Sequence, residues 1–205
     1  SDLRETGFFA EPFPIETIYS EDERLLNQDI LEVSNYFSFG FQEAGTLINN
    51  RIYTTRYTAK SQEAVKLGEI LQRDVSEEFY LGEELGRWTY MKGAKAEPRT
   101  TKEGFEYTYR EGAVGFPDNL DLPARTMLTS EASVNRSTHV VNDPQTNRLR
   151  VLTPVECERL NGFNDEWTNT GMTQKFRYFC MGNALVVGLI ERMGKKLNKI
   201  FELED

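Results

Sequence analysis

Two cysteines and a single histidine are the side chains of this 205-residue chain best suited to nucleophilic or metal chemistry. Cys157 lies between Glu156 and Glu158, whose carboxylates are expected to raise the pKa of its thiol and suppress the reactive thiolate. Cys157 and Cys180 have no CxxC spacing, and His139 alone cannot complete a four-ligand zinc set. Both cysteines fall within apolar, helix-like patterns. We therefore interpret them as buried free thiols of a reducing compartment, and predict neither a catalytic residue nor a metal site.

Basic side chains are concentrated in the middle of the chain. Residues 1–85 hold 7 Lys and Arg against 17 Asp and Glu, residues 86–150 hold 10 against 8, and residues 151–205 hold 7 against 8. The net charge of −9 argues at first sight against a nucleic-acid partner. Phosphate binding depends on local patches, however, and residues 86–110 hold 6 basic against 3 acidic side chains. This excess is modest, and taken alone it favours a solvated surface.

The elements that must position these residues begin with a mixed N-terminal half. The spacing of apolar residues in Glu21–Val33 predicts a short amphipathic helix. The run Thr46–Thr58 is rich in β-branched and aromatic residues and predicts a hairpin that turns at Asn49-Asn50. Val65–Leu71 is compatible with a short helix.

Four further segments favour strands. Trp88–Met91 and Phe105–Tyr109 are strand-like, and the polar segment Lys92–Gly104 between them is interpreted as a loop. Ser137–Val141 and Arg148–Leu152 are expected to pair across a turn that starts at Asp143-Pro144.

The C-terminal third changes to a helical pattern. Thr153, Pro154 and Glu156 form the signature of a capping box, and Gly162 can end that helix in the left-handed conformation. A second helix is predicted over Gln174–Met181. We expect Asn183 to cap a third helix, whose apolar stripe consists of Leu185, Val186, Leu189, Ile190, Met193 and Leu197.

No run of about 18 apolar residues is present, so no transmembrane helix is expected. No apolar signal segment follows the opening SDLRETGFF. A cytoplasmic location is therefore the expectation.

Two blocks carry a resemblance to a known family. They are Arg150–Trp167, RVLTPVECERLNGFNDEW, and Gln174–Met193, QKFRYFCMGNALVVGLIERM. Together they resemble the last two conserved blocks of the DNA cytosine-5 methyltransferases, whose patterns are R-x-L-T-P-x-E-C-x-R-L-x-G-F-x-D and Q-x-Y-x-x-x-G-N-(A/S)-V. The chain departs from them at Asn164, where Pro is usual, and at Ala184, where Ser is frequent.

A third segment, Leu122–Val141, resembles the end of the family's target recognition domain. The resemblance implies that Thr126, in the pair Thr126-Met127, lies against the DNA backbone beside a flipped cytosine. Trp88–Pro117 is similar to the variable recognition region of one methyltransferase subgroup. His139 would then be either structural or a hydrogen-bond donor that faces DNA.

The family's catalytic blocks do not occur in this sequence. These are Pro-Cys-Gln, which supplies the nucleophilic thiolate, Glu-Asn-Val, the Gly-rich F-x-G-x-G and Q-x-R-x-R. The resemblance thus implies the C-terminal part of a methyltransferase, either a fragment or the smaller chain of a split enzyme, inactive alone. A non-enzymatic acidic interaction domain is the alternative, and a complete small nucleic-acid enzyme is disfavoured.

The resemblance also implies site residues and partners. S-adenosylmethionine would contact Asn183 and Ala184 once an N-terminal catalytic domain or partner subunit completes the site. The predicted contacts to double-stranded DNA are Arg87, Lys92, Lys95, Arg99, Lys102, Arg110, Arg125, Thr126, Asn135 and Arg136. The residues expected to organise the recognition domain are Arg150, Thr153, Pro154, Glu156, Arg159 and Gly162.

The expected fold class is α+β, with a small, mixed, β-rich recognition domain and a helical C-terminal segment. The expected domains are an acidic connecting segment over residues 1–45, the target recognition domain over 46–149 and the conserved blocks over 150–205. The last helix would pack on the missing catalytic domain, or on a second copy when the chain is isolated. The function implied is cytosine-5 methylation of DNA in a restriction-modification system.

Overall fold

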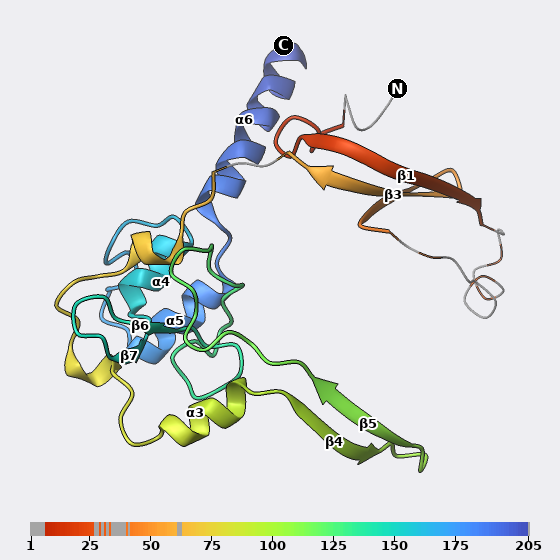
Figure 1. Ribbon diagram of the computed structural model, residues 1–205. Coiled ribbons are helices and arrows are strands. Elements are labelled where there is room, and N and C mark those ends of the chain that lie inside the picture. The colour runs from red at the N-terminus through yellow and green to blue at the C-terminus, as the bar shows by residue number, and fades with distance from the viewer. Residues whose placement is uncertain are drawn as a thin grey trace. The chain divides into compact units, whose positions relative to one another are not determined.

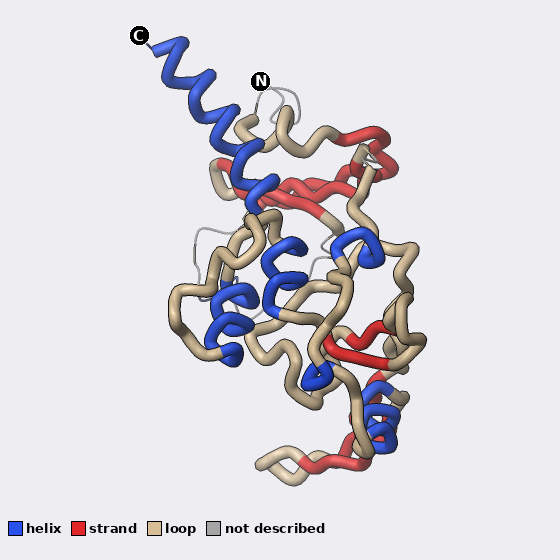
Figure 2. Tube along the Cα trace, turned by 90° about the vertical axis from the view of Figure 1, so that its left-hand side faces the viewer, coloured by secondary structure: helices blue, strands red, loops and turns tan. Residues whose placement is uncertain are grey.

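The computed structural model describes residues 7–26, 29, 31, 33, 40, 42–60 and 63–204. Its contacts divide the chain into two compact units: Ala64–Ile190, and Ser1–Glu63 together with Glu191–Asp205. Both units contain strands and helices (Figures 1 and 2), so the predicted α+β class is confirmed. Among the described residues, no helix has the length and apolar character needed to cross a membrane.

The unit that contains the N-terminal residues is built on a three-stranded antiparallel sheet. Its strands are β1 (Ile15–Leu25), β2 (Ala44–Ile48) and β3 (Arg51–Ala59), in the order β1-β3-β2. Asn49 and Asn50 form the turn between β2 and β3 with φ of 48° and 59°. Two successive residues with positive φ are typical of tight hairpin turns, in which Asn is well tolerated. The predicted hairpin is therefore confirmed.

The helix predicted over Glu21–Val33 is wrong in its first part. Residues 21–25 continue β1 and pair with β3, for example Glu21 with Thr55 and Arg24 with Ile52. Pairing with a strand distant in the sequence overrides the local helical spacing, which is a weak preference. Residues 27, 28, 30 and 32 of this segment lie outside the described residues.

The unit of residues 64–190 is centred on two short strands and two helices. Strands β6 (Val140–Asn142) and β7 (Leu149–Val151) pair as predicted, with Val141 opposite Arg150. The turns η1 (Leu67–Ile70) and η2 (Glu77–Phe79) are 3-10 helices, and η1 lies within the helix expected at residues 65–71. The larger core cluster consists of Leu67, Ile70, Val141, Leu152, Cys157, Tyr178 and Met181. This core spans the expected domain boundary at residue 150.

Two predictions in the middle of the chain are wrong. Trp88–Met91 belongs to the helix α3 (Leu85–Lys92), not to a strand. Trp88 and Lys92, one turn apart on the same face, are both buried, and a short apolar run does not distinguish helix from strand. The expected loop contains strand β4 (Lys95–Thr100), which pairs with β5 (Glu106–Glu111). The β4–β5 ribbon projects from the rest of its unit (Figure 1).

The helical C-terminal third is confirmed, with one correction. The helices are α4 (Pro154–Leu160), α5 (Gln174–Asn183) and α6 (Val187–Glu204). Thr153 and Glu156 form the predicted capping box, and Gly162 has φ of 80°. Asn183 does not cap α6. It is the last residue of α5, and its side-chain amide donates to the Phe179 carbonyl at 2.9 Å, because α5 continues beyond the predicted end.

A fully buried arginine joins the elements of the 64–190 unit. Arg150 on β7 donates from Nε to Asp143 at 2.6 Å and from Nη1 and Nη2 to Glu156 at 2.8 and 2.7 Å. Glu156 also accepts the backbone N–H groups of Thr153 and Gln72, at 2.8 and 2.7 Å. One cation thereby fixes β7, the turn after β6, the start of α4 and the segment after η1.

Two more arginine–carboxylate pairs hold the helices. Arg177 of α5 contacts the buried Glu158 of α4 at 2.9 Å. Arg159 donates to both carboxylate oxygens of Asp165, at 2.7 and 2.6 Å, and to the Ile70 carbonyl at 2.9 Å. The first pair joins α4 to α5, and Arg159 joins α4 to η1 and to the loop that follows α4.

We predict that Arg150→Ala lowers the free energy of unfolding by about 3–5 kcal/mol, because it leaves two carboxylates buried without their cation. Arg148→Ala is the matched control. Arg148 is half-exposed and pairs with the exposed Glu77, so its loss is expected to cost at most about 1 kcal/mol. Urea denaturation of both variants measures the difference, and equal losses would contradict the assigned role of Arg150.

Candidate functional site

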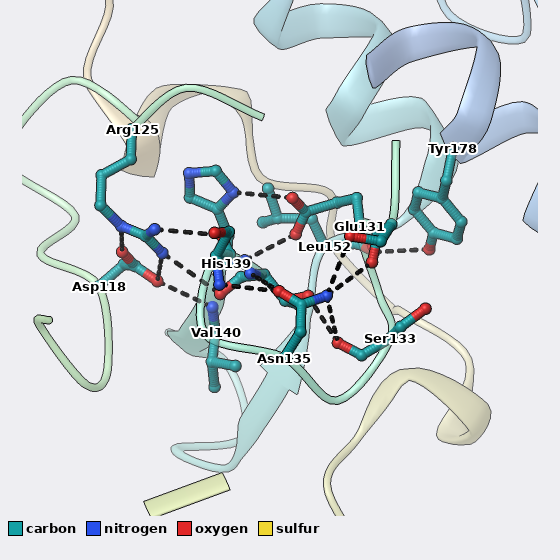
Figure 3. Close-up of polar contacts among 12 residues, drawn as sticks. Asp118, Arg125, Glu131, Ser133, Asn135, His139, Val140, Leu152 and Tyr178 are labelled. Carbon is teal, nitrogen blue, oxygen red and sulfur yellow. Dashed lines mark hydrogen bonds and ion pairs between the residues drawn. The ribbon is translucent and has the colours of Figure 1, made fainter. Parts of the chain in front are cut away.

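The loop between β5 and β6 is held in place by a buried carboxylate. Asp118 accepts two bonds from Arg125, from Nε at 2.7 Å and from Nη2 at 3.2 Å, and one from the Val140 backbone N–H at 2.9 Å. Arg125 donates further to the carbonyls of Ser137 and Thr138, at 3.1 and 3.2 Å. Figure 3 shows this guanidinium turned toward Asp118 and β6. Arg125, predicted to contact DNA, thus has its hydrogen bonds engaged within the protein.

Thr126 lies between two anchored neighbours. Arg125 is tied to Asp118, and Met127 packs against the larger core cluster. Thr126 itself is exposed. The alternation of inward and outward side chains therefore presents the Thr126 hydroxyl to solvent from a segment that is fixed on both sides.

The lone histidine is a core residue. His139 is fully buried, with Nδ1 3.2 Å from Glu131, and its backbone N–H donates to the same carboxylate at 2.6 Å (Figure 3). Asn135 stabilises the preceding turn, since its side-chain oxygen accepts the N–H groups of Ser137 and Thr138 at 2.7 and 2.9 Å. His139 therefore does not face DNA, and its predicted structural role is the one that its burial supports.

Lys92 is also buried, so its prediction as a surface contact is corrected. Its ammonium group donates to the carbonyls of Arg136, at 3.0 Å, and Thr138. Burial, followed by the nearby charge of Arg125, lowers the pKa of Lys92 to about 8. Arg136 in turn donates to the carbonyls of Gly93 and Gly112. These two basic residues join α3 and the β4–β5 ribbon to the loop before β6.

The remaining predicted cations differ in their pairing. Arg87 pairs with Glu84 at 3.5 Å, Lys95 with Glu111 at 4.0 Å, and Arg99 with Glu97 at 3.6 Å. Within the described residues, the side chains of Lys102 and Arg110 have no hydrogen bond or ion pair, and both are exposed. The residue count of the sequence therefore overstates the charge available to an anionic ligand.

The turn between α5 and α6 is fixed by Asn161, which follows α4. Its side-chain amide donates to the Met181 carbonyl at 2.8 Å, and its own carbonyl accepts the N–H of Val187 at 2.8 Å. Asn183 is exposed at this turn, whereas Ala184 packs against the larger core cluster. The neighbouring Leu185 is 67% exposed, so the turn offers an amide beside an apolar surface.

The end of α5 lies against the segment that follows Thr126. A methyl group added to Gly182 would lie 2.5 Å from the Leu128 carbonyl carbon and from the Thr129 Cα. Only glycine permits this approach of two backbones. Gly182 therefore brings the turn that contains Asn183 into contact with the segment Thr126–Thr129.

The sequence did not predict the structural roles of three residues of this site. Asp118 and Glu131 act through partners that are close only in the fold, so no local pattern identifies them. Gly182 does leave a signal, because a glycine inside a helical pattern indicates a packing constraint.

Cys157 has the inert environment that the sequence predicts. It is fully buried and free, and burial raises the pKa of its thiol, with further contributions from Glu131, Glu156 and Glu158. A thiolate is therefore strongly disfavoured at this position.

We predict that Gly182→Ala lowers the free energy of unfolding by about 1–3 kcal/mol, because the methyl group must displace the backbone at residues 128–129. Gly86→Ala in α3 is the control, since nothing lies within 4 Å of its added methyl group and alanine favours a helix by about 0.5–1 kcal/mol. Thermal unfolding distinguishes them, and unchanged stability in Gly182→Ala would contradict the close approach.

Comparisons with known proteins support the family resemblance carried by the two sequence blocks. The family profile of the C-5 cytosine-specific DNA methylases matches residues 15–199. The chain is 48% identical over 199 residues to type II methyltransferase M.Sau3AI of Staphylococcus aureus, covering 95% of this chain and 47% of that protein. Type II methyltransferase M.DsaV of Dactylococcopsis salina is 24% identical over 170 residues, covering 82% of this chain and 44% of that protein.

The solved structure of the Entamoeba histolytica methyltransferase EhMeth aligns with a TM-score of 0.46 and 16% identity, over 89% of this chain and 54% of that chain. The chain spans about half the length of the two curated relatives, M.Sau3AI and M.DsaV. The profile match extends over most of the chain, from β1 into α6. On this match and the 48% identity, the chain belongs to the C-5 cytosine-specific DNA methylase family.

Proposed function

We propose that this chain is the C-terminal, target-recognising portion of a DNA (cytosine-5-)-methyltransferase of a restriction-modification system. The enzyme would transfer a methyl group from S-adenosylmethionine to C5 of a flipped cytosine in duplex DNA. The observation that carries the proposal is the presentation of Thr126, exposed between the anchored Arg125 and Met127. The match to about half of M.Sau3AI supports a portion of a larger enzyme.

The proposed division of labour follows the chain. Residues 46–149 would form the target recognition domain, residues 150–205 the supporting conserved blocks, and residues 1–45 an acidic connection. Arg150, Thr153, Pro154, Glu156, Arg159 and Gly162 would act as structural residues. Their contacts support this role, because Arg150, Thr153 and Glu156 are buried. The Glu156 carboxylate accepts hydrogen bonds from the Arg150 side chain and from the Thr153 backbone N–H. They would hold the DNA-facing loop rather than touch the substrate.

The chemistry of methylation requires a thiolate that attacks C6 of the cytosine. Cys157 is unsuited to this role because it is buried and its pKa is raised. The nucleophile would therefore come from the complementary catalytic portion. The residues of this chain would hold the target in place, with the Thr126 hydroxyl donating to a backbone phosphate beside the flipped base.

The turn after α5 fits one wall of a cofactor site. S-adenosylmethionine, when bound, supplies the methyl group and a sulfonium charge. The exposed Asn183 offers polar groups and Leu185 an apolar surface, whereas Ala184 has no hydroxyl to contribute. Asn183 would thus make a polar contact and Ala184 a backbone or van der Waals contact, and the other walls would come from the catalytic portion.

Exposed apolar side chains at the start of α6 and just before it support an interface with a missing partner. Leu185, Val186, Leu189 and Ile190 are 40–67% exposed. Contiguous apolar patches on soluble proteins commonly mark interaction sites. We propose that the catalytic portion covers this patch, and that a second copy of the chain can cover it when the chain is isolated.

We predict that the isolated chain transfers no methyl group, because Cys157 is buried with a raised pKa and the sequence contains neither Pro-Cys-Gln nor Glu-Asn-Val. Incubation with tritiated S-adenosylmethionine and mixed-sequence duplex DNA measures the transfer. Addition of the complementary catalytic portion is the positive control and is expected to restore incorporation. Incorporation by the isolated chain above background would overturn the proposal.

We predict that Thr126→Ala leaves the fold intact and weakens DNA binding by the complete enzyme by about 1 kcal/mol, the value of one hydrogen bond. Thr170→Ala is the matched control, because Thr170 is an exposed threonine on the loop between α4 and α5. Titration with a labelled duplex measures both. Equal affinity of the two variants would rule out a DNA contact at Thr126.

A further inference from the structure

The unpaired positive charge of the proposed recognition surface is confined to the β4–β5 ribbon. Eight basic residues were predicted to contact DNA: Arg87, Lys92, Lys95, Arg99, Lys102, Arg110, Arg125 and Arg136. Six of them bond to carboxylates or carbonyls of the protein itself. Within the described residues, only Lys102, at the tip of the ribbon, and Arg110, on β5, have no such partner.

The two faces of this ribbon differ. One face carries Lys95, Glu97, Arg99, Tyr107, Tyr109 and Glu111, as the pairing of β4 and β5 requires. Its side chains satisfy one another: the Arg99 guanidinium lies 3.7 Å from the centre of the Tyr109 ring, and the Tyr109 hydroxyl donates to Glu111 at 2.5 Å. Arg136 also approaches Glu111, at 3.6 Å. Most of the polar groups on this face are thus engaged with one another, although Arg99 and Tyr107 are exposed.

The opposite face is open. It carries Ala96, Pro98, Thr100, Glu106, Thr108 and Arg110, all exposed. The β4 half of this face is flat because its residues are small, and the β5 half carries the longer polar side chains. Among these, Arg110 can donate two parallel hydrogen bonds, and Thr108 can donate or accept.

The dimensions of the ribbon suit a DNA groove. Each strand has six residues, about 20 Å of extended chain, and a two-stranded ribbon fits the major groove, which is about 12 Å wide. The ribbon projects from its unit, so the open face is accessible (Figures 1 and 2). Arginine bonds to O6 and N7 of guanine, and a carboxylate accepts from the amino group of cytosine.

We propose that the open face of the β4–β5 ribbon enters the major groove and reads base edges, with Arg110 on a guanine and Lys102 on a phosphate. This inference rests on the proposed function and adds the reading element. Glu106 supports base readout over general phosphate binding, because phosphates would repel its carboxylate. Residues 95–111 hold four basic and four acidic side chains, so the ribbon contributes selection rather than affinity.

A strand of another protein is a poorer partner for the ribbon than duplex DNA. Pro98 removes a backbone donor from β4, and proline on an exposed strand opposes the addition of another strand. The open face also lacks the apolar side chains that would bury area against a protein. Duplex DNA therefore accounts best for the polar groups of β5.

The test uses the complete methyltransferase and a pool of duplex oligonucleotides of randomised sequence, with methylated positions identified by bisulfite sequencing. Arg110→Ala is expected to reduce the preference at one base pair by about 5- to 150-fold and to leave the other positions unchanged. Lys102→Ala is expected to weaken all sequences alike and to reduce the slope of log affinity against log salt by about 1. Arg73→Ala is the control, since Arg73 is exposed and has no bonded partner among the described residues.

The outcomes separate the two proposals. A wild-type enzyme that methylates no cytosine in the pool overturns the proposed function and the ribbon assignment together. A selective wild-type enzyme whose preferences are unchanged in Arg110→Ala, or reduced equally at every position, overturns the ribbon assignment alone. A lower melting temperature of Arg110→Ala with unchanged preferences would indicate a protein contact instead and would also overturn it.

Discussion

The buried ion pairs of Arg150 are the interaction on which the 64–190 unit depends. A guanidinium removed from water is tolerated only when its charge and its donors are satisfied. Asp143 and Glu156 provide both, and each is held by backbone N–H groups of a different segment. Because these bonds converge on one side chain, they fix the turn after β6, the start of α4 and the chain at Gln72 relative to β7.

That arrangement extends to the exposed threonine through few contacts. Arg150 lies opposite Val141 in the β6–β7 ladder, and the adjacent Val140 donates to Asp118. Asp118 holds Arg125, which precedes Thr126. The buried Arg150 thus helps to fix the exposed Thr126, which we propose faces DNA, without itself reaching the surface.

The elements predictable from the sequence were those with local signals. The capping box at Thr153, the Asn49-Asn50 hairpin and the β6–β7 pair each follow from residues within a few positions of one another. The strand character of residues 21–25 depends on a partner about 30 positions away, and no local pattern reveals it. Similarly, the sequence predicted basic residues near residue 100 but could not reveal which of them are neutralised by carboxylates or carbonyls.

The pairing of these cations also bears on our proposal that an acidic chain binds DNA. A net charge of −9 would repel a duplex if recognition relied on general attraction. Three of the basic side chains predicted to contact DNA, Lys92, Arg125 and Arg136, instead hold loops together, and their donors cannot be exchanged for phosphates at low cost. A surface with few unpaired cations gains little from counterion release, so its contacts contribute discrimination between sequences. Most of the affinity for the duplex would then have to come from the complementary portion of the enzyme.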